Sequence, residues 1–458
     1  MNHKKHPLIT IYITNFNYGK YIKQAIESVL NQTIKDFELI IVDDGSEDES
    51  LGIINDYKDN PKIKIIKQLN RGLNVSNNIV LKLAKGKYII RLDADDWLEK
   101  SALKELSNVL NNNPKVGLVF ADYFHVNKYG VIIERVKRHN FKNVNLLDQP
   151  AHGACTLIRT KILKSIGGYD EDFKCQDGFD LWIRFIQEFE VSNINKPLFF
   201  YRQHDKNLTS NEKKILSTRA RILEKVSIRK NKPLKILSVL SVRGKRYDSS
   251  CVAFEKLNEK FVIDWTIDAI EKSNKTDLLI IDTPDLDIFN YAQSKNKKNI
   301  KSIIRDPKLA ELNVSIYPSI KNIVASIEAL ENKKFDAIFQ FTIDSPFRSQ
   351  IYIDSAINIM SLFNTELVIG VREENDFIYQ HNGNGLETIK ANNELRLERE
   401  DLYKEVGSMR LIKRDYLFHQ EKFPKPKIGH VKLDEKSSLR INTELSWEIA
   451  KHIASIDI

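Results

Sequence analysis

Short apolar runs alternate with amphipathic helical segments along the first half of the chain, and this alternation most restricts its fold. The runs at 8–14, 37–46, 62–68 and 87–92 have the length and the β-branched content of strands. The segments at 19–32 and 72–86 place their apolar side chains on one helical face. Strands that alternate with helices form mostly parallel sheets, so the sequence predicts an α/β fold.

A second alternation of the same kind begins beyond residue 230. A charged helical stretch runs into Pro233, and further strands are expected at 234–242, 277–282, 335–342, 365–371 and 407–414, with a helix at 318–334. A chain of 458 residues is also too long for one ordinary core. We therefore predict two α/β domains, residues 1–230 and residues 231–458.

The composition argues against several classes of protein. No apolar run is long enough to cross a membrane, polar residues interrupt the N-terminal apolar stretch where a signal peptide would continue, and three cysteines are too few for a disulfide framework or a zinc site. A cytoplasmic protein is expected. The net charge of +9 has two interpretations. The lysines are simply solvated, or the charge attracts phosphate-bearing partners, including the inner face of a membrane. No motif indicates nucleic acid.

Two acidic clusters follow strands of the first half. Asp43 and Asp44 end the second strand, and Asp93, Asp95 and Asp96 end the fourth. Ligands of such sheets bind at the carboxyl ends of strands, and an Asp-x-Asp turn can hold Mg²⁺ or Mn²⁺ against a diphosphate. A solvated turn or a helix cap explains most isolated pairs of this kind. Two clusters at one edge favour the metal site here.

Several ordered motifs of residues 7–210 resemble those of family 2 glycosyltransferases of the GT-A fold. The stretch "PLITIYITNFNYGKYIKQAIESVLNQTIKDFELIIVDDGSED" is similar to the opening of these enzymes, and "NRGLNVSNNIVLKLAKGKYIIRLDADDWL" continues it. "GGYDEDFKCQDGFDLWIRF" resembles the segment that carries the family's catalytic base. The resemblance implies a metal-dependent, inverting transfer of a sugar from a nucleotide-sugar, with UDP as the expected nucleotide, to a saccharide or lipid-linked acceptor during polysaccharide or glycoconjugate synthesis.

The resemblance also implies roles for individual residues. Those implied to contact the nucleotide-sugar are Thr14, Phe16, Asp43, Asp44, Asn70, Gly72, Asn78, Asp93 and Asp95. Asp95 would bind the metal at the diphosphate, Asp93 would contact the ribose or the metal, and His204 could approach the metal or stand on the surface.

Asp177 would be the general base, taking the proton of the acceptor hydroxyl as its oxygen attacks the anomeric carbon. The alternative is an ordinary N-cap of the helix that follows. Trp182 and Phe185 are expected in the core of that helix rather than stacked on sugar. A contact between His152 and the acceptor is no better than an even choice.

The second half resembles the cytidylyltransferases that activate sialic acid-like sugars, which implies a nucleotidyltransferase-like α/β fold. The motif "FDAIFQFTIDSPFRSQIYIDSAI" carries the likeness, together with "EVGSMRLIKRDYL" and "SSLRINTELSWEIAKHI". The first loop, at 241–261, keeps Arg243 but has one glycine and lacks the family's lysine. Asp344 and Arg348 persist.

The late motif departs from the family in its charges. Arg440 and Asn442 stand where metal-binding aspartates are expected. An arginine repels Mg²⁺, so the sequence favours a degenerate domain that serves in binding or in homodimer formation. Two alternatives stay open: an active domain that makes a CMP-sugar donor for the first domain, and a whole chain that is a non-catalytic sugar-nucleotide scaffold.

Overall fold

The computed structural model divides the chain into two compact units, which are described separately. One comprises Met1–Asn211 and Phe377–Glu400, and the other comprises Glu212–Asp376 and Asp401–Ile458. The structure describes residues 6–136, 153–204, 211–230, 233–374, 376, 378–389 and 402–456. The sequence placed the domain boundary at residue 230, so the two divisions differ over residues 212–230 and over residues 377–400.

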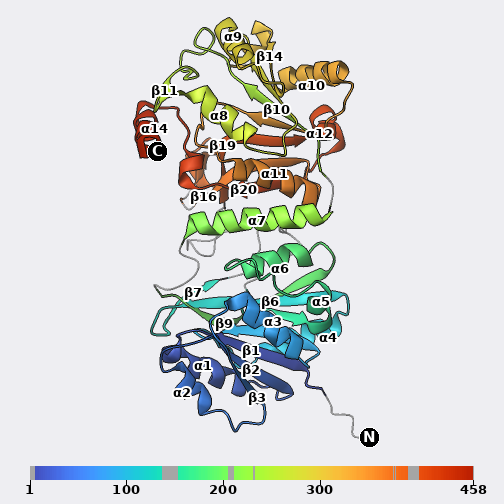
Figure 1. The fold of residues 1–458 in the computed structure, drawn as a ribbon, viewed down its shortest axis with the longest axis vertical. Coiled ribbons are helices and arrows are strands. Elements are labelled where there is room, and N and C mark those ends of the chain that lie inside the picture. Colours follow the sequence, from blue (N-terminus) through green and yellow to red (C-terminus); the bar gives the residue numbers. More distant parts are fainter. Residues whose placement is uncertain are drawn as a thin grey trace. The chain divides into compact units, whose positions relative to one another are not determined.

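The first unit is built on a nine-stranded mixed sheet, coloured from blue to green in Figure 1. Its elements, in chain order, are β1 (Ile9–Asn15), α1 (Gly19–Leu30), β2 (Phe37–Asp43), α2 (Ser50–Asn55), β3 (Ile63–Lys67), α3 (Leu73–Leu83), β4 (Tyr88–Asp93), β5 (Trp97–Leu98), α4 (Ala102–Asn112), β6 (Val116–Val126), β7 (Ile132–Val136), β8 (Leu157–Arg159), α5 (Thr160–Ser165), α6 (Asp177–Phe185) and β9 (Glu190–Arg202). A small hairpin, β17 (Tyr379–His381) and β18 (Leu386–Thr388), completes the elements grouped with this unit.

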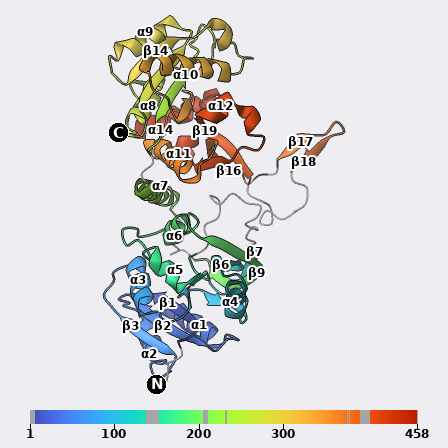
Figure 2. The same cartoon turned by 90° about the vertical axis from the view of Figure 1, so that its right-hand side faces the viewer.

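Helices cover both faces of this sheet, with α1 and α4 on one side and α3 and α5 on the other (Figure 2). The alternating Ile9, Ile11 and Ile13 of β1 are fully buried in a core that they share with α1 and α4. The alternation of side chains along β1, which sends the three isoleucines to one face, and the apolar stripe of α1 therefore build this layer. Thr10 and Tyr12 on the other face of β1 are buried as well.

The register of the parallel strands brings the functional candidates together. The sheet order is β3-β2-β1-β4 at this end, followed by β8-β6-β9-β5. Thr14 of β1 is level with Asp93 of β4, and Asn15 is level with Asp43 of β2. Both acidic clusters therefore lie at one carboxyl edge of adjacent strands, as the α/β pattern predicts.

Three described strands of the first unit, β5, β7 and β8, run antiparallel to their neighbours. Strands β6 and β9 were not expected from the sequence, and they pair in parallel over most of their length with register shifts beside Asp122. β8 runs antiparallel between β4 and β6. The sheet is mixed because its second half is not built from strand-helix-strand crossovers.

The second unit contains a seven-stranded sheet, in the order β14-β13-β10-β15-β19-β16-β20, and a two-stranded ribbon, β11-β12. Its elements are α7 (Glu212–Lys230), β10 (Ile236–Ser241), β11 (Lys256–Leu257), β12 (Lys260–Phe261), α8 (Val262–Glu271), β13 (Leu278–Thr283), α9 (Leu286–Ser294), β14 (Ile300–Ile304), α10 (Tyr317–Glu331), β15 (Ala337–Phe341), α11 (Gln350–Phe363), β16 (Leu367–Glu374), β19 (Leu402–Lys413), α12 (Arg414–Phe418), β20 (Ile428–Lys432), α13 (Glu435–Ser438) and α14 (Glu444–Ile456), with short 3₁₀ turns at Pro307–Ala310 and Gln420–Lys422. Only β19 is antiparallel to its neighbours in the larger sheet, among the strands that the structure describes.

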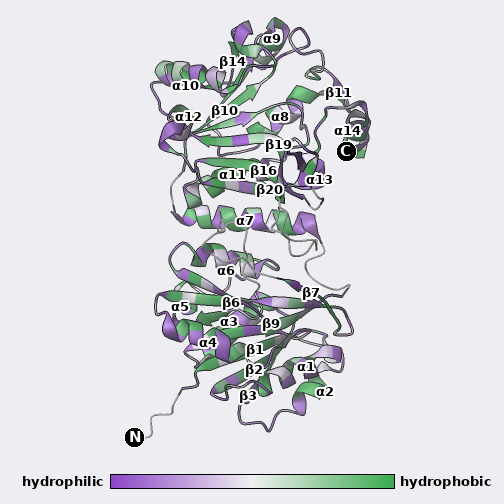
Figure 3. Cartoon of the chain, turned by 180° about the vertical axis from the view of Figure 1, so that it is seen from behind, coloured by the Kyte–Doolittle hydropathy of each residue, from purple (hydrophilic) through white to green (hydrophobic). Residues whose placement is uncertain are grey.

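Helix α7 packs against α11 within the second unit. Its Ile222 and Val226 are buried, and Glu224 accepts a hydrogen bond from Asn358 of α11, 2.9 Å away. Strands such as β1 and β10 are mainly hydrophobic, whereas α7 alternates polar and apolar residues (Figure 3). Within the described ranges, no helix combines the length and hydropathy needed to cross a membrane.

Candidate functional site

The turn after β4 is fixed by a buried carboxylate and by an arginine from the end of β9. Asp96 is 1% exposed, and its Oδ1 accepts the backbone N–H of Arg202 at 2.9 Å. Arg202 Nε donates to the carbonyl of Asp95 at 2.9 Å, and its guanidinium lies over the ring of Trp97. Burial, together with the charges of Asp95 and Asp93, raises the pKa of Asp96 well above its ordinary value. Asp96 therefore shapes the turn.

Asp95 faces a histidine at the carboxyl edge. His204 Nε2 lies 2.9 Å from Asp95 Oδ2, and both side chains are largely buried. The His204 ring stacks on Tyr21 and is tilted against Tyr18. Burial, followed by the nearby charges of Asp95 and Asp93, raises the pKa of Tyr18 above its ordinary value. The negative potential here would attract a cation.

The donor set at this turn fits a divalent ion only in part. The Asp95 carboxylate and the His204 imidazole form an oxygen-nitrogen pair that Mn²⁺ accepts and that Mg²⁺ accepts less readily. Among the described residues, no group of three or more His, Cys, Asp or Glu side chains is arranged to hold a metal. A metal held by this pair would take its remaining ligands from a bound diphosphate and from water.

A buried arginine connects the acidic turn to the proposed base. Arg91 is 5% exposed; its Nε lies 2.9 Å from Asp93 Oδ1, and its Nη1 lies 2.5 Å from Asp177 Oδ2. Burial alone lowers the pKa of Arg91, but Asp177 and Asp93 raise it well above its ordinary value. Burial raises the pKa of Asp93 to about 6, against the opposing effect of Arg91. Asp93, Arg91 and Asp177 therefore form an array in which one buried cation lies between two acids.

Asp177 does not act as a helix cap. It is the first residue of α6, whereas the cap position is held by Gln176, a non-glycine residue in the left-handed region at φ 62° with no side-chain capping bond. Asp180, also in the first turn of α6, pairs with Arg184 at 2.6 Å. The buried Trp182 and Phe185 hold α6 in the core, as expected. The N-cap interpretation of Asp177 is thus wrong.

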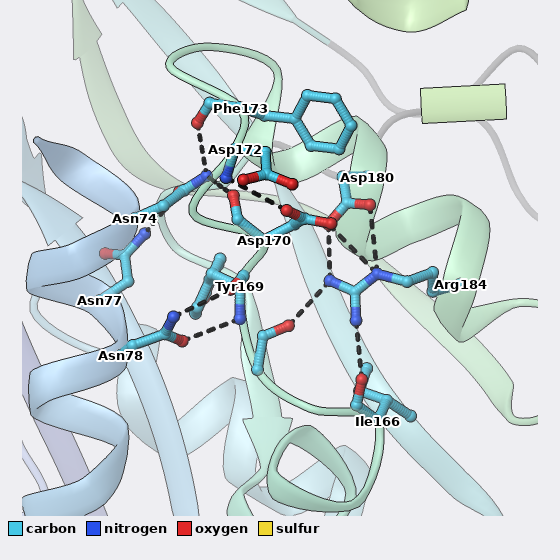
Figure 4. A network of polar contacts seen from close by, with 11 residues as sticks. Asn74, Asn77, Asn78, Ile166, Tyr169, Asp170, Asp172, Phe173, Asp180 and Arg184 are labelled. Carbon is cyan, nitrogen blue, oxygen red and sulfur yellow. Dashed lines mark hydrogen bonds and ion pairs between the residues drawn. The ribbon is translucent and has the colours of Figure 1, made fainter. Parts of the chain in front are cut away.

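Helix α3 anchors the loop that leads to Asp177 (Figure 4). Asn74 Nδ2 donates to the carbonyls of Asp170 and Phe173, each at 2.8 Å. Asn78 donates to the carbonyl of Tyr169 and accepts its N–H, both at 2.9 Å. The sequence assigned Asn78 to the surroundings of the nucleotide, and in the structure its amide is engaged with this loop.

The same loop is tied to α6 by Arg184. Its guanidinium donates to the carbonyls of Ile166 and Gly168, each at 2.8 Å, while it pairs with Asp180 (Figure 4). Gly168 has φ +69°, and a Cβ there would lie 2.6 Å from Asn78 Oδ1. The loop before Asp177 therefore has little freedom.

At the end of β2, two carboxylates organise backbone amides. Asp44 Oδ1 accepts Arg71 N–H at 2.9 Å and Gln68 Nε2–H at 2.6 Å, and Oδ2 accepts Gly72 N–H at 2.8 Å. Asp43 accepts a hydrogen bond from the side chain of Asn15 at 2.9 Å. Both acids shape the rim, and contact between Asp44 and a base stays a prediction.

The remaining nucleotide candidates border this rim. Thr14 is half-buried at the end of β1, and Phe16, just beyond, is 43% exposed. Gly72 has φ +93°, which favours glycine, and caps α3. Asn70 is exposed, and its backbone nitrogen would lie 2.7 Å from a Cβ built on Gly45, so the two loops approach closely. His152 lies outside the described residues.

In the second unit, an arginine forms an ion pair with Asp344, the acid that the sequence singled out. Arg440 Nε forms an ion pair with Asp344 Oδ2, and Thr342 donates its hydroxyl to Asp344 Oδ1. Burial by itself would raise the pKa of Asp344, but hydrogen bonds from Thr342 and Ser408 and the charge of Arg440 lower it. Asp344 therefore already has a cationic partner.

The other candidates of the second unit contact the protein. Arg348 is buried and donates to the carbonyls of Gly407, Thr342 and Ser408, and burial lowers its pKa to about 10. Arg243 Nε donates to the carbonyl of Ala310, and the backbone N–H of Asn442 bonds Ser446 Oγ. These bonds hold loops together.

Arg91 and Arg202 are the residues of the first site that sequence reasoning missed. Arg91 could have been found from its place, because it is a charged residue inside the buried run of β4 and lies two positions before Asp93, on the same strand face. A buried charge needs a partner. Arg202 carries no comparable signal.

Known proteins similar to this chain were found by comparison, and the family match lies in the first unit. Residues 10–167 match the family model described as Glycosyl transferase family 2. The chain is 32% identical over 206 residues to an uncharacterized glycosyltransferase of Methanocaldococcus jannaschii, a match that covers 43% of this chain and 71% of that protein. It is 27% identical over 252 residues to chondroitin synthase of Escherichia coli, covering 53% of this chain and 34% of the synthase.

Among solved structures, TarS 1-349 of S. aureus in complex with UDP-GlcNAc aligns with a TM-score of 0.42 at 19% identity, covering 48% of this chain and 65% of the other. The chain thus spans only about a third of the length of the chondroitin synthase that it matches.

Proposed function

The chain belongs to glycosyl transferase family 2, and we propose that its first unit transfers a sugar from a nucleoside diphosphate to an acceptor hydroxyl with inversion at the anomeric carbon. The observation that carries the proposal is the Asp93-Arg91-Asp177 array, which sets a candidate base beside the acidic turn at the edge where β1, β2 and β4 end. Ligands of such sheets bind at this edge.

In this mechanism, Asp177 takes the proton of the acceptor hydroxyl while the acceptor oxygen attacks the anomeric carbon. The bond from that carbon to the diphosphate oxygen breaks on the opposite face, which inverts the configuration, and the electron pair leaves with the nucleoside diphosphate. Asp95 and His204, with Asp93 nearby, are the residues that would hold Mn²⁺ or Mg²⁺. The ion would neutralise the charge of the leaving diphosphate.

Similarity to a chondroitin synthase supports a saccharide acceptor in polysaccharide or glycoconjugate synthesis, and the donor that the motif resemblance implies is a UDP-sugar. A lipid-linked acceptor at the inner face of a membrane is the alternative that the net charge of +9 favours. Sedimentation of the protein with anionic and with neutral vesicles separates the two: binding to anionic vesicles that salt removes supports the membrane-linked acceptor.

The test is a thermal-shift screen of nucleotides with and without Mn²⁺, followed by a transfer assay with the nucleotide-sugar that stabilises the protein, since a ligand that binds the folded state raises its stability. Asp177→Asn should keep nucleotide binding and lose transfer. Exposed Asp59→Asn is the matched control and should leave both unchanged. Normal transfer by Asp177→Asn would place the base elsewhere.

For the second unit, we propose a non-catalytic role in binding or dimer formation. The pairing of Arg440 with Asp344 supports this, because a guanidinium on that carboxylate competes with Mg²⁺. The alternative is an active cytidylyltransferase. Incubating the full chain with CTP, Mg²⁺ and 2-keto sugar acids, and measuring pyrophosphate, separates them: sugar-dependent pyrophosphate release would overturn the non-catalytic role.

A further inference from the structure

We propose that Arg91 is a positioning residue for sugar transfer, holding the carboxylate of Asp177 toward the acceptor and in register with Asp93 on the donor side. This inference rests on the proposed function of the first unit. It assigns to a strand residue, outside both acidic motifs, the task of coupling the two halves of the site.

The position of Arg91 on β4 explains how one side chain reaches both acids. Residues two apart on a strand point to the same face, so Arg91 and Asp93 are neighbours by construction. The long side chain then extends to the first residue of α6, where Nη1 meets Asp177 Oδ2 at 2.5 Å. A guanidinium presents several donors in a fixed plane, and a lysine ammonium cannot hold two separate carboxylates in the same way.

The surroundings of the Arg91–Asp177 pair leave it little room to move. A Cβ at Gly153 would lie 2.4 Å from an Arg91 Nη atom and 3.1 Å from Asp177 Oδ2, so the backbone of Gly153 closes directly over the pair. The buried hydroxyls of Tyr12 and Tyr169, 3.1 Å apart, lie close enough to Arg91 to interact with its charge. The ion pair is therefore held on more than one side.

Only one oxygen of Asp177 is used in this arrangement. Arg91 holds Oδ2, and none of the described residues donates a hydrogen bond to Oδ1. The side chain of Asp177 is 12% exposed, so it keeps limited access to solvent. Oδ1 is thus the oxygen available to an acceptor hydroxyl, and its direction follows from how Arg91 holds Oδ2.

A double-mutant cycle of Arg91→Lys and Asp177→Asn tests the inference with the full chain. If Arg91 acts through Asp177, Arg91→Lys alone should lower kcat by about 10- to 100-fold with donor KM changed less than about threefold, and it should add no further loss to Asp177→Asn. A purely structural role would give multiplicative losses in the double variant. Arg135→Lys, at another Arg–Asp pair in the same unit, is the matched control and should retain kcat.

Gly153→Ala provides a second variant that keeps every charge. Its added methyl group pushes against Arg91 and Asp177, so we expect the same loss of kcat with nucleotide binding retained. Unchanged kcat in both Arg91→Lys and Gly153→Ala, or multiplicative losses in the cycle, would overturn the role of Arg91 while leaving the transferase proposal intact. A wild-type chain that neither binds nucleotides nor transfers sugar would overturn the proposed function, and the role of Arg91 with it.

Discussion

Helix α3 anchors the loop that leads to Asp177, and this anchoring can be tested through Asn74. This side chain is 5% exposed and donates one hydrogen bond to the carbonyl of Asp170 and one to that of Phe173, both at 2.8 Å. Asn74→Ala removes both donors and leaves the two carbonyls to find other partners. Because the loop runs directly into Asp177, we expect the change to reach the site as well as the fold.

The expected loss of stability follows from the two bonds. A net contribution of about 1 kcal/mol each, plus the penalty of a buried carbonyl left without a donor, gives about 3 kcal/mol. Alanine's higher helix propensity returns about 0.5 kcal/mol, which leaves a loss of about 2.5 kcal/mol. For a unit of this size, 1 kcal/mol corresponds to a shift of about 3 °C in Tm, so Asn74→Ala should lower Tm by about 8 °C.

The assay is thermal unfolding of the full chain, with the transition of the first unit identified by its upward shift when nucleotide is added. Asn108→Ala is the matched control, since Asn108 is an exposed residue within α4 and the exchange brings the same gain in propensity. We expect no loss of Tm in the control. Initial rates of transfer, measured well below the Tm of each variant, should show a lower kcat for Asn74→Ala at similar donor KM.

Two results would refute this reasoning. An Asn74→Ala variant as stable as the Asn108→Ala control would mean that water or other donors replace both bonds without loss. A variant that loses stability but keeps the wild-type kcat would mean that the loop does not set the position of Asp177.

Three further predictions concern the two acidic centres and a buried ion pair. Asp95→Asn should abolish transfer and remove the effect of Mn²⁺ on nucleotide affinity, which titration with and without a chelator checks. Asp282 pairs with Arg305 at 2.5 Å, both almost fully buried, so Asp282→Asn should destabilise the second unit by about 3 kcal/mol in urea unfolding without changing transfer. The lowered pKa of Asp344 favours folding above the ordinary carboxyl value and loses that effect as pH falls below about 4, so Arg440→Gln should flatten this acid-dependent loss of stability.

The arrangement of β1, β2, β3 and β4 could be predicted because each strand carries its own signal. Their apolar runs, separated by helices with 3.6-residue periodicity, leave a parallel sheet as the simple solution, and the acidic ends then meet at one edge. The long β9, by contrast, has polar and proline-containing stretches such as "SNINKP" within its span. Its strand character depends on pairing with β6, which local sequence does not reveal.

The sequence could single out candidate site residues only where they stand in a motif. Asp95 and Asp177 stand in recognisable motifs, but the sequence does not indicate that Asn78 holds the backbone of Tyr169 or that Asp44 holds the amides of Arg71 and Gly72. These are contacts between segments distant along the chain. They depend on loop conformations that follow from the tertiary fold.

Two similar Asp–Arg ion pairs in this chain differ in burial, and they therefore differ in what the arginine can do. Arg91 is 5% exposed on a central strand, so moving away from Asp93 and Asp177 would leave a buried guanidinium without its partners, and the ion pairs are a fixed part of the first site. Arg440 is 66% exposed, and its partner Asp344 is 20% exposed, so the guanidinium can turn into solvent at little cost. An arginine of the first kind fixes the geometry of an acid, whereas one of the second kind competes for an acid with whatever cation approaches. The same two residue types therefore favour the base proposed for the first unit and the metal-free role proposed for the second.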